Sequence, residues 1–207
     1  LTLNEDYPLI RVYRCPRDLK SEQGDWIPLA RRARHKLPLP PVPGYFVRHI
    51  HRYTKIPIGV IYGVHGMSYV DHWKVGDSCF KKYLQPVVPY GVKGAIKIYD
   101  GGPDLIQSRK LIDGWRKAWG QDIAFVYAPY FLNITARKDE EPDPVVGQRL
   151  QFHNHYLDAE GGILGLFKIP NVTYAAMFDM STTDGKICHF SHKHPVGQRL
   201  ALAAEGL

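Results

Sequence analysis

The amino-acid sequence predicts an α/β protein built on a doubly wound, mostly parallel sheet. Short apolar runs rich in β-branched residues alternate with stretches in which apolar residues recur at helical spacing. Two of the clearest apolar runs stop at Gly63 and at Asp100-Gly101, as strands of a βαβ unit do. At 207 residues the chain is long enough to form one such domain with its own hydrophobic core.

The expected strands are short, and the expected helices are longer. Leu105–Trp119 is the clearest helix, because its apolar residues follow helical spacing and Gly120 suits a left-handed cap. Pro195 suits the first turn of the closing helix. The expected strands are Leu9–Tyr13, Ile58–Tyr62, Gly94–Ile98, Ile123–Ala128 and Thr173–Phe178, and the expected helices are Tyr45–Tyr53, Leu105–Trp119, Val145–Leu157 and Val196–Ala204. In such a sheet, sites lie at the carboxyl ends of the strands.

The chain is basic, and its excess charge is concentrated near the start. The net charge is +7, and residues 1–55 hold 11 lysines and arginines against 5 acidic residues. Residues 30–44 combine the densest positive charge with several prolines, which predicts an exposed arm or loop. Such an arm suits an acidic partner such as RNA, a membrane surface or an acidic protein, although a solvated surface loop is the simpler interpretation. The partner-binding candidates are Arg31, Arg32, Arg34 and Lys36.

Other sequence features restrict the class of protein. The three cysteines, Cys15, Cys79 and Cys188, show no metal-like spacing and predict buried thiols rather than a disulfide framework. No apolar run reaches the roughly 18–20 residues of a membrane helix, so we expect no membrane span. We also expect no cofactor.

Several blocks of the sequence, in shared order, resemble one enzyme family. They are spread from about Leu9 to Ala204 and include Gly24–Pro28, Ile56–Ile61, Pro86–Ile96, Asp113–Gly120 and His194–Leu202. Together they resemble the sialate O-acetylesterase group of carbohydrate esterases within the SGNH hydrolase superfamily. The resemblance implies the three-layer, flavodoxin-like SGNH fold, with residues 1–207 forming a single domain that lacks its N-terminal nucleophile segment.

The family's chemistry requires a nucleophilic serine, a histidine base, an acid that orients the histidine, and donors for the oxyanion. The resemblance places the serine upstream of the blocks present in this chain. Gly76-Asp77-Ser78 has the letters of a nucleophile motif, but no apolar strand leads into it, as a nucleophile turn requires. We therefore interpret this triplet as a coincidence.

The remaining catalytic blocks are altered. Acidic residues at Asp100 and Asp104 stand where the family has oxyanion donors, and loss of one donor typically costs about 2.7–4 kcal/mol. His194 matches the family's catalytic histidine, but His192 stands where its orienting aspartate belongs, a change worth on the order of 10⁴ in rate in serine proteases. Gly66 matches a position that offers a backbone oxyanion donor.

Closely spaced histidines raise the alternative of a metal site. His189, His192 and His194 form one group, and the pairs at positions 49/51 and 153/155 can converge if the chain there is extended. No cysteine pattern supports a metal, and the SGNH mechanism uses none. We prefer surface or former active-site histidines and expect no metal.

The leading hypothesis is a catalytically inactive, sialate O-acetylesterase-like protein that serves as a structural or adaptor subunit of a larger assembly. We expect the assembly to be organellar and to contain other protein subunits. We also expect it to contain RNA, which would bind to the basic arm. A mitochondrial setting is favoured over a lysosomal or secreted one. The alternatives are an active O-acetylesterase whose serine lies on an absent N-terminal segment, with His194 as general base and Gly66 as oxyanion donor, and a non-catalytic sugar-binding module.

Overall fold

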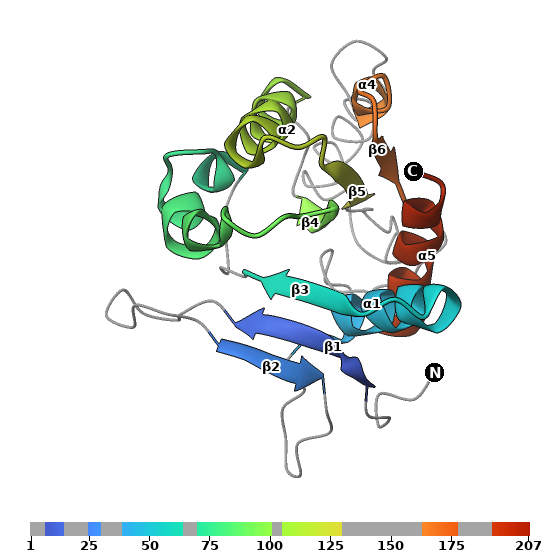
Figure 1. Cartoon of the computed structure of the whole chain (residues 1–207). Coiled ribbons are helices and arrows are strands. Elements are labelled where there is room, and N and C mark those ends of the chain that lie inside the picture. Colours follow the sequence, from blue (N-terminus) through green and yellow to red (C-terminus); the bar gives the residue numbers. More distant parts are fainter. Residues whose placement is uncertain are drawn as a thin grey trace, which may run out of the picture.

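Two three-stranded sheets form the centre of the computed structural model (Figure 1). The structure describes residues 7–14, 25–29, 39–63, 70–100, 105–129, 163–177 and 192–207. Along the chain the elements are β1 (Tyr7–Arg14), β2 (Asp25–Leu29), α1 (Pro41–Thr54), β3 (Ile58–Tyr62), η1 (Val70–Trp73), η2 (Phe80–Leu84), η3 (Gln85–Val87), β4 (Gly94–Asp100), α2 (Leu105–Trp119), β5 (Ala124–Pro129), α4 (Ile163–Leu166), β6 (Val172–Tyr174) and α5 (Lys193–Glu205).

The two sheets differ in strand direction. In the first, of order β2-β1-β3, β1 pairs antiparallel with β2 and parallel with β3, and Ile10 lies opposite Ile58. In the second, of order β4-β5-β6, all strands are parallel, and Gly94 lies opposite Ala124. The predicted α/β class is therefore confirmed, although the described residues form two sheets rather than one continuous sheet.

Helices cover both faces of the strands, because side chains alternate between the faces along each strand. On one face, Ile10 and Val12 of β1 pack in a cluster with Val47 of α1. Val126 of β5 packs on the same face, in a cluster with residues of α1 and α5. Figure 1 shows α1 and α5 together on this side of the molecule.

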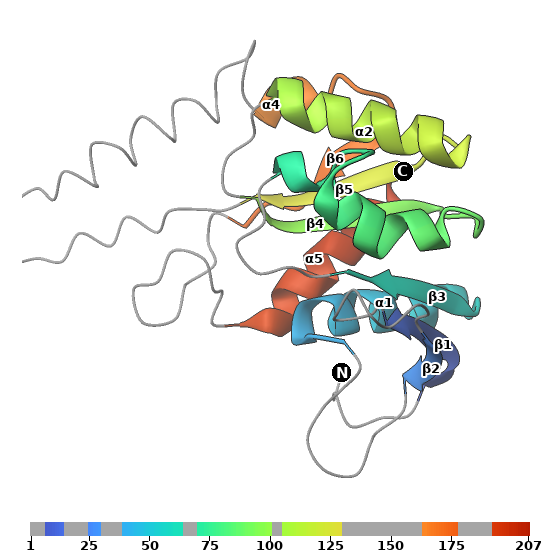
Figure 2. The ribbon, with the colours of Figure 1, turned by 90° about the vertical axis from the view of Figure 1, so that its left-hand side faces the viewer.

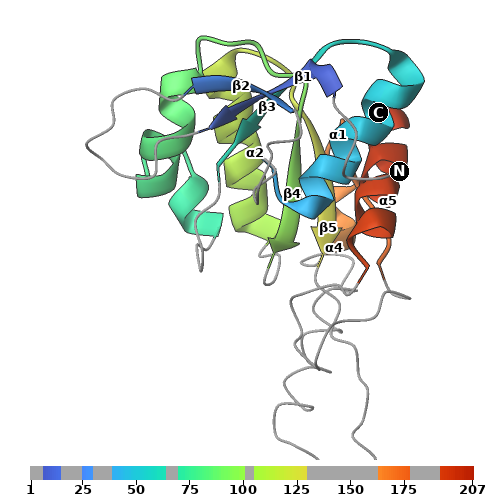
Figure 3. The same cartoon turned by 90° about the horizontal axis from the view of Figure 1, so that it is seen from below.

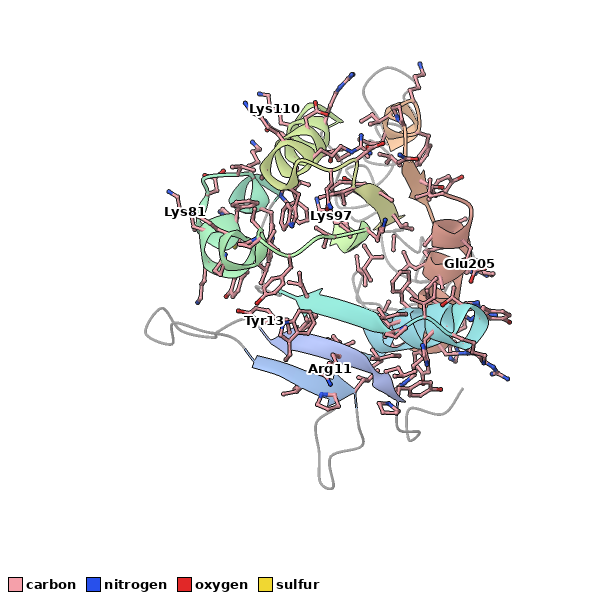
Figure 4. The ribbon with its side chains drawn as sticks, viewed as in Figure 1. Arg11, Tyr13, Lys81, Lys97, Lys110 and Glu205 are labelled. Carbon is pink, nitrogen blue, oxygen red and sulfur yellow. The ribbon has the colours of Figure 1, made fainter. Side chains whose placement is uncertain are left out.

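The opposite face packs against α2 and the η turns. Phe125 and Tyr127 of β5 lie in a cluster with Leu111 and Ile112 of α2. Tyr13 of β1 packs with Phe80 of η2, which is a single π-helical turn. Figure 4 shows lysines 81 and 110 extending outward from this helical side. The described elements thus form a helix–strand–helix arrangement.

Several predicted boundaries were wrong. Of the predicted arm at residues 30–44, residues 41–44 belong to α1, which begins at Pro41 because a first-turn residue needs no backbone N–H partner. The last strand is Val172–Tyr174 rather than Thr173–Phe178. The predicted helix Val145–Leu157 lies outside the described residues. In the part of the chain that the structure describes, no helix has the length and apolarity needed to cross a membrane.

Candidate functional site

The candidate site centres on His194, in the first turn of α5. The helix begins at Lys193, and His192 precedes it with extended backbone and no side-chain cap. Pro195 lies in the first turn, as predicted. Figure 3 shows this turn of α5 at the same edge of the molecule as the ends of β4 and β5. We call this side the carboxyl edge, where parallel α/β folds carry their sites.

The His194 ring packs against α1. Its centroid lies 4.8 Å from that of Tyr45, with the rings inclined at 70°. Its Nε2 atom is buried and has no hydrogen-bond partner within the described structure. Burial, together with the nearby His49, lowers the pKa of His194 below its ordinary value. The geometry therefore favours a neutral imidazole that serves as a packing group.

A second imidazole lies on the facing helix. His49 of α1 is 3% exposed, and its Nε2 is likewise buried without a hydrogen-bond partner in the described residues. Its ring centroid lies 4.6 Å from that of Tyr53. The buried His49 and the half-buried His194 thus both place an unsatisfied Nε2 atom in the α1/α5 interface, and sequence reasoning missed this role of His49.

Gly197 allows the two helices to approach closely. A Cβ atom at this position would lie 2.6 Å from the Tyr45 Cβ, 2.7 Å from the Val42 carbonyl oxygen and 2.9 Å from the Phe46 amide nitrogen. The helical backbones are therefore in direct contact one turn after His194. The glycine inside the predicted closing helix was the sequence signal for this contact, since glycine is otherwise unfavourable there.

The other predicted site residues divide into two groups. His51 lies on α1 with His49, but its Nδ1 donates to the Ile56 carbonyl oxygen, at 2.8 Å, on the exposed side. The proposed pairing of His49 with His51 was wrong, because residues two apart on a helix point in different directions. Among the described side chains, no group of three or more histidine, cysteine or acidic residues is placed to hold a metal ion. The predicted site residues that lie outside the described ranges are Arg31, Arg32, Arg34, Lys36, Gly66, Asp104, His153, His155 and His189.

The Gly76-Asp77-Ser78 triplet lies in an exposed turn. Gly76 has a φ of 93°, and the triplet follows the 3₁₀ turn η1 rather than a strand. The Asp77 carbonyl oxygen accepts a hydrogen bond from the Lys81 amide at 2.9 Å, which places the triplet at the start of the helical turns around η2. This geometry is unlike a strand-to-helix nucleophile turn.

Comparison with known proteins identifies a shared fold. No family model matches the chain, and no curated protein matches it. A protein of Arabidopsis thaliana with an X-ray structure at 1.6 Å resolution is similar, with a TM-score of 0.65 and 11% sequence identity. The match covers 99% of this chain and 83% of that one. At this identity the likeness concerns the fold alone.

Proposed function

We propose that the chain is a non-catalytic SGNH-type domain that serves as a structural or adaptor subunit of a larger assembly. The observation that carries this proposal is the environment of His194. Its ring lies against Tyr45, and its Nε2 has no partner in the described residues. The resemblance in the sequence blocks supports the SGNH assignment, and the α/β architecture is compatible with it.

A working esterase base requires two polar contacts. One ring nitrogen must receive the proton of the nucleophile, and the other must donate to a carboxylate that stabilises the imidazolium. No acidic side chain of the described residues hydrogen-bonds to His194, and the preceding His192 offers an imidazole instead. The lowered pKa of His194 also disfavours the imidazolium form that general-base catalysis would generate.

The described surface offers apolar side chains for contacts with other subunits. Four large apolar residues are at least half exposed, namely Leu9 at 50%, Tyr53 at 66%, Ile56 at 61% and Leu202 at 53%. Protein subunits are therefore the proposed partners. RNA contact through the basic arm and an organellar, mitochondrial setting stay predictions of this proposal.

The proposal is tested by assaying hydrolysis of p-nitrophenyl acetate and of acetylated sialic acid by the protein from its complete reading frame. We expect no turnover above the rate of a matched His194→Ala variant. The native protein, isolated from its source, is expected to elute as a complex larger than its own mass. A monodisperse single chain without partners would contradict the adaptor role.

An active O-acetylesterase is the second candidate, and the unpaired Nε2 of His194 is the observation that favours it. A buried acceptor nitrogen costs about 1–3 kcal/mol when it lacks a donor, and a serine hydroxyl supplies such a donor in active enzymes. In that case His194→Ala would abolish a measurable activity. His49→Ala serves as the matched control, because it changes a buried histidine of the same interface.

A further inference from the structure

The segment that joins α1 to β3 exposes large apolar side chains. All six residues from Arg52 to Pro57 are exposed. Tyr53 is 66% exposed and Ile56 is 61% exposed, the two highest values among the large apolar residues of the described structure. We call residues 52–57 the α1–β3 turn. Single exposed apolar residues are ordinary on protein surfaces, whereas two of them in one short turn indicate a contact surface.

Hydrogen bonds fix the backbone of the α1–β3 turn. The Thr54 hydroxyl donates to the Ile50 carbonyl oxygen at 2.9 Å and accepts from the Ile56 amide at 3.3 Å. The Lys55 amide donates to the His51 carbonyl oxygen at 2.8 Å, and the Nδ1 of His51 donates to the Ile56 carbonyl oxygen at 2.8 Å. Both the amide and the carbonyl group of Ile56 are therefore held in place. A surface fixed in this way loses little conformational entropy when a partner binds.

A buried residue orients the Tyr53 side chain. The Tyr53 ring centroid lies 4.6 Å from that of His49, which is only 3% exposed. The ring therefore has a contact with the protein interior, while most of the side chain stays accessible to a partner. This contact positions Tyr53 without burying it.

The surroundings of the two apolar residues are basic. Arg52 and Lys55 are exposed in the same turn, and no acidic residue occurs between Leu39 and Gly63. Cations near the end of a helix stabilise it through the helix dipole, but this role requires no exposed apolar neighbours. Tyrosine and arginine are among the residue types that dominate the energy of protein interfaces. The α1–β3 turn therefore matches a pocket that is apolar at its centre and carries carboxylates at its rim.

Other classes of partner fit this surface less well. A helix that binds a membrane presents a broad apolar face to the lipid, whereas α1 buries Val42 and Val47 inside the protein. A single-stranded nucleic acid would bind the cations and stack on Tyr53, but it would offer little contact to Ile56. The observations therefore favour a protein as the partner.

The α1–β3 turn lies away from the candidate site. It leads directly into the start of β3, whereas His194 lies in the first turn of α5, at the carboxyl edge. Figure 2 shows the start of β3 and the first turn of α5 at opposite edges of the molecule. Contacts made by the turn are therefore independent of the chemistry of His194.

We propose that the α1–β3 turn is the docking surface for another protein subunit. An apolar pocket of that subunit receives Tyr53 and Ile56, and carboxylates at the rim of the pocket pair with Arg52 and Lys55. This inference rests on the proposed function as a subunit of a larger assembly. It adds the surface of contact and the chemistry of the partner.

Photo-cross-linking in the native source tests which molecule meets the turn. A photoreactive phenylalanine analogue replaces Tyr53 in the protein from its complete reading frame, and the adducts are sequenced by mass spectrometry. We expect adducts with a different protein. The same analogue at Tyr90, which is 49% exposed and lies on the side of α2, should not give them. Adducts with nucleic acid, with lipid or with a second copy of this chain would overturn the proposal, as would identical adducts at the two positions.

Substitutions in the turn test the chemistry of the contact. When the purified assembly is diluted, the Tyr53→Ala variant should dissociate at a concentration at least about 30-fold higher than the original protein, as expected of a dominant interface residue. Arg52→Glu should also weaken the assembly, because it places like charges together at the pocket rim. Tyr53→Phe, which keeps the ring, and the matched control Tyr90→Ala should dissociate like the original protein.

The outcomes separate this inference from the proposed function. An assembly that is unchanged by Tyr53→Ala and by Arg52→Glu would overturn the docking surface and leave the subunit role intact. A single chain that elutes without partners would overturn both. None of these outcomes depends on esterase activity.

Discussion

Replacing Gly197 by alanine tests how closely α1 and α5 must pack. The added Cβ would lie 2.6 Å from the Tyr45 Cβ and 2.7 Å from the Val42 carbonyl oxygen. Ordinary carbon contacts are about 3.5–4.0 Å, so the helices must move apart by roughly 1 Å. Two of the three nearest atoms belong to the α1 backbone and cannot rotate away. The strain therefore cannot be relieved by a change of side-chain rotamer.

The expected loss of stability follows from two opposing terms. Overpacking of this kind typically costs about 1–3 kcal/mol, and the rigid backbone contacts favour the upper end. Alanine gains about 1 kcal/mol over glycine in a helix interior. The net destabilisation is therefore about 2 kcal/mol, which for a protein of 207 residues lowers the Tm by about 4–8 °C.

Urea denaturation followed by tryptophan fluorescence measures this loss. Gly114→Ala in α2 is the matched control, because its Cβ would meet only the flexible Val75 side chain, at 3.3 Å. The control should be neutral or stabilising by up to about 1 kcal/mol. If Gly197→Ala were as stable as Gly114→Ala, the close contact between α1 and α5 would be wrong.

Substitutions at three further positions test individual contacts. Because burial lowers the pKa of His194, the unfolded chain binds more protons, so the free energy of unfolding should fall as the pH drops below about 6.5. The urea midpoint of unfolding should therefore depend less on pH in the His194→Phe variant than in the original protein. If the two proteins showed the same dependence of the midpoint on pH, the lowered pKa of His194 would be wrong. Arg116→Ala removes hydrogen bonds to the Ile123 and Pro170 carbonyl oxygens and should cost about 2–3 kcal/mol in denaturant unfolding, whereas Arg116→Lys should restore only part. Lys55→Gly should raise the free energy of unfolding by about 1 kcal/mol, because Lys55 caps α1 with a left-handed φ of 58°; lower stability would refute that strain.

The elements that sequence reasoning found are those whose local pattern is strong. The run at residues 123–128 is continuously apolar, and β5 is buried on both faces there. β2 was missed, since Asp25–Leu29 is short and contains Pro28, which an edge strand tolerates. The start of α1 was assigned to an arm because prolines in a first turn look the same in sequence as prolines in a loop.

The candidate site could be predicted only in part. The position of His194 at the start of the closing helix followed from its place beside Pro195. The contact of His194 with Tyr45 could not be predicted, because the two residues are distant in sequence and no local pattern indicates which helices pack together. The burial of His49 could not be predicted for the same reason, since its near neighbour His51 is only half-buried on the same helix.

The Nε2 atoms of His49 and His194 are interior polar groups without a hydrogen-bond partner among the described residues. Native folds satisfy such groups, and local sequence normally agrees with the global structure. The two functional candidates differ in whether a serine hydroxyl donates to the Nε2 atom of His194. Absence of esterase turnover in the protein from its complete reading frame would support the non-catalytic subunit, whereas turnover that is lost in His194→Ala would establish the esterase.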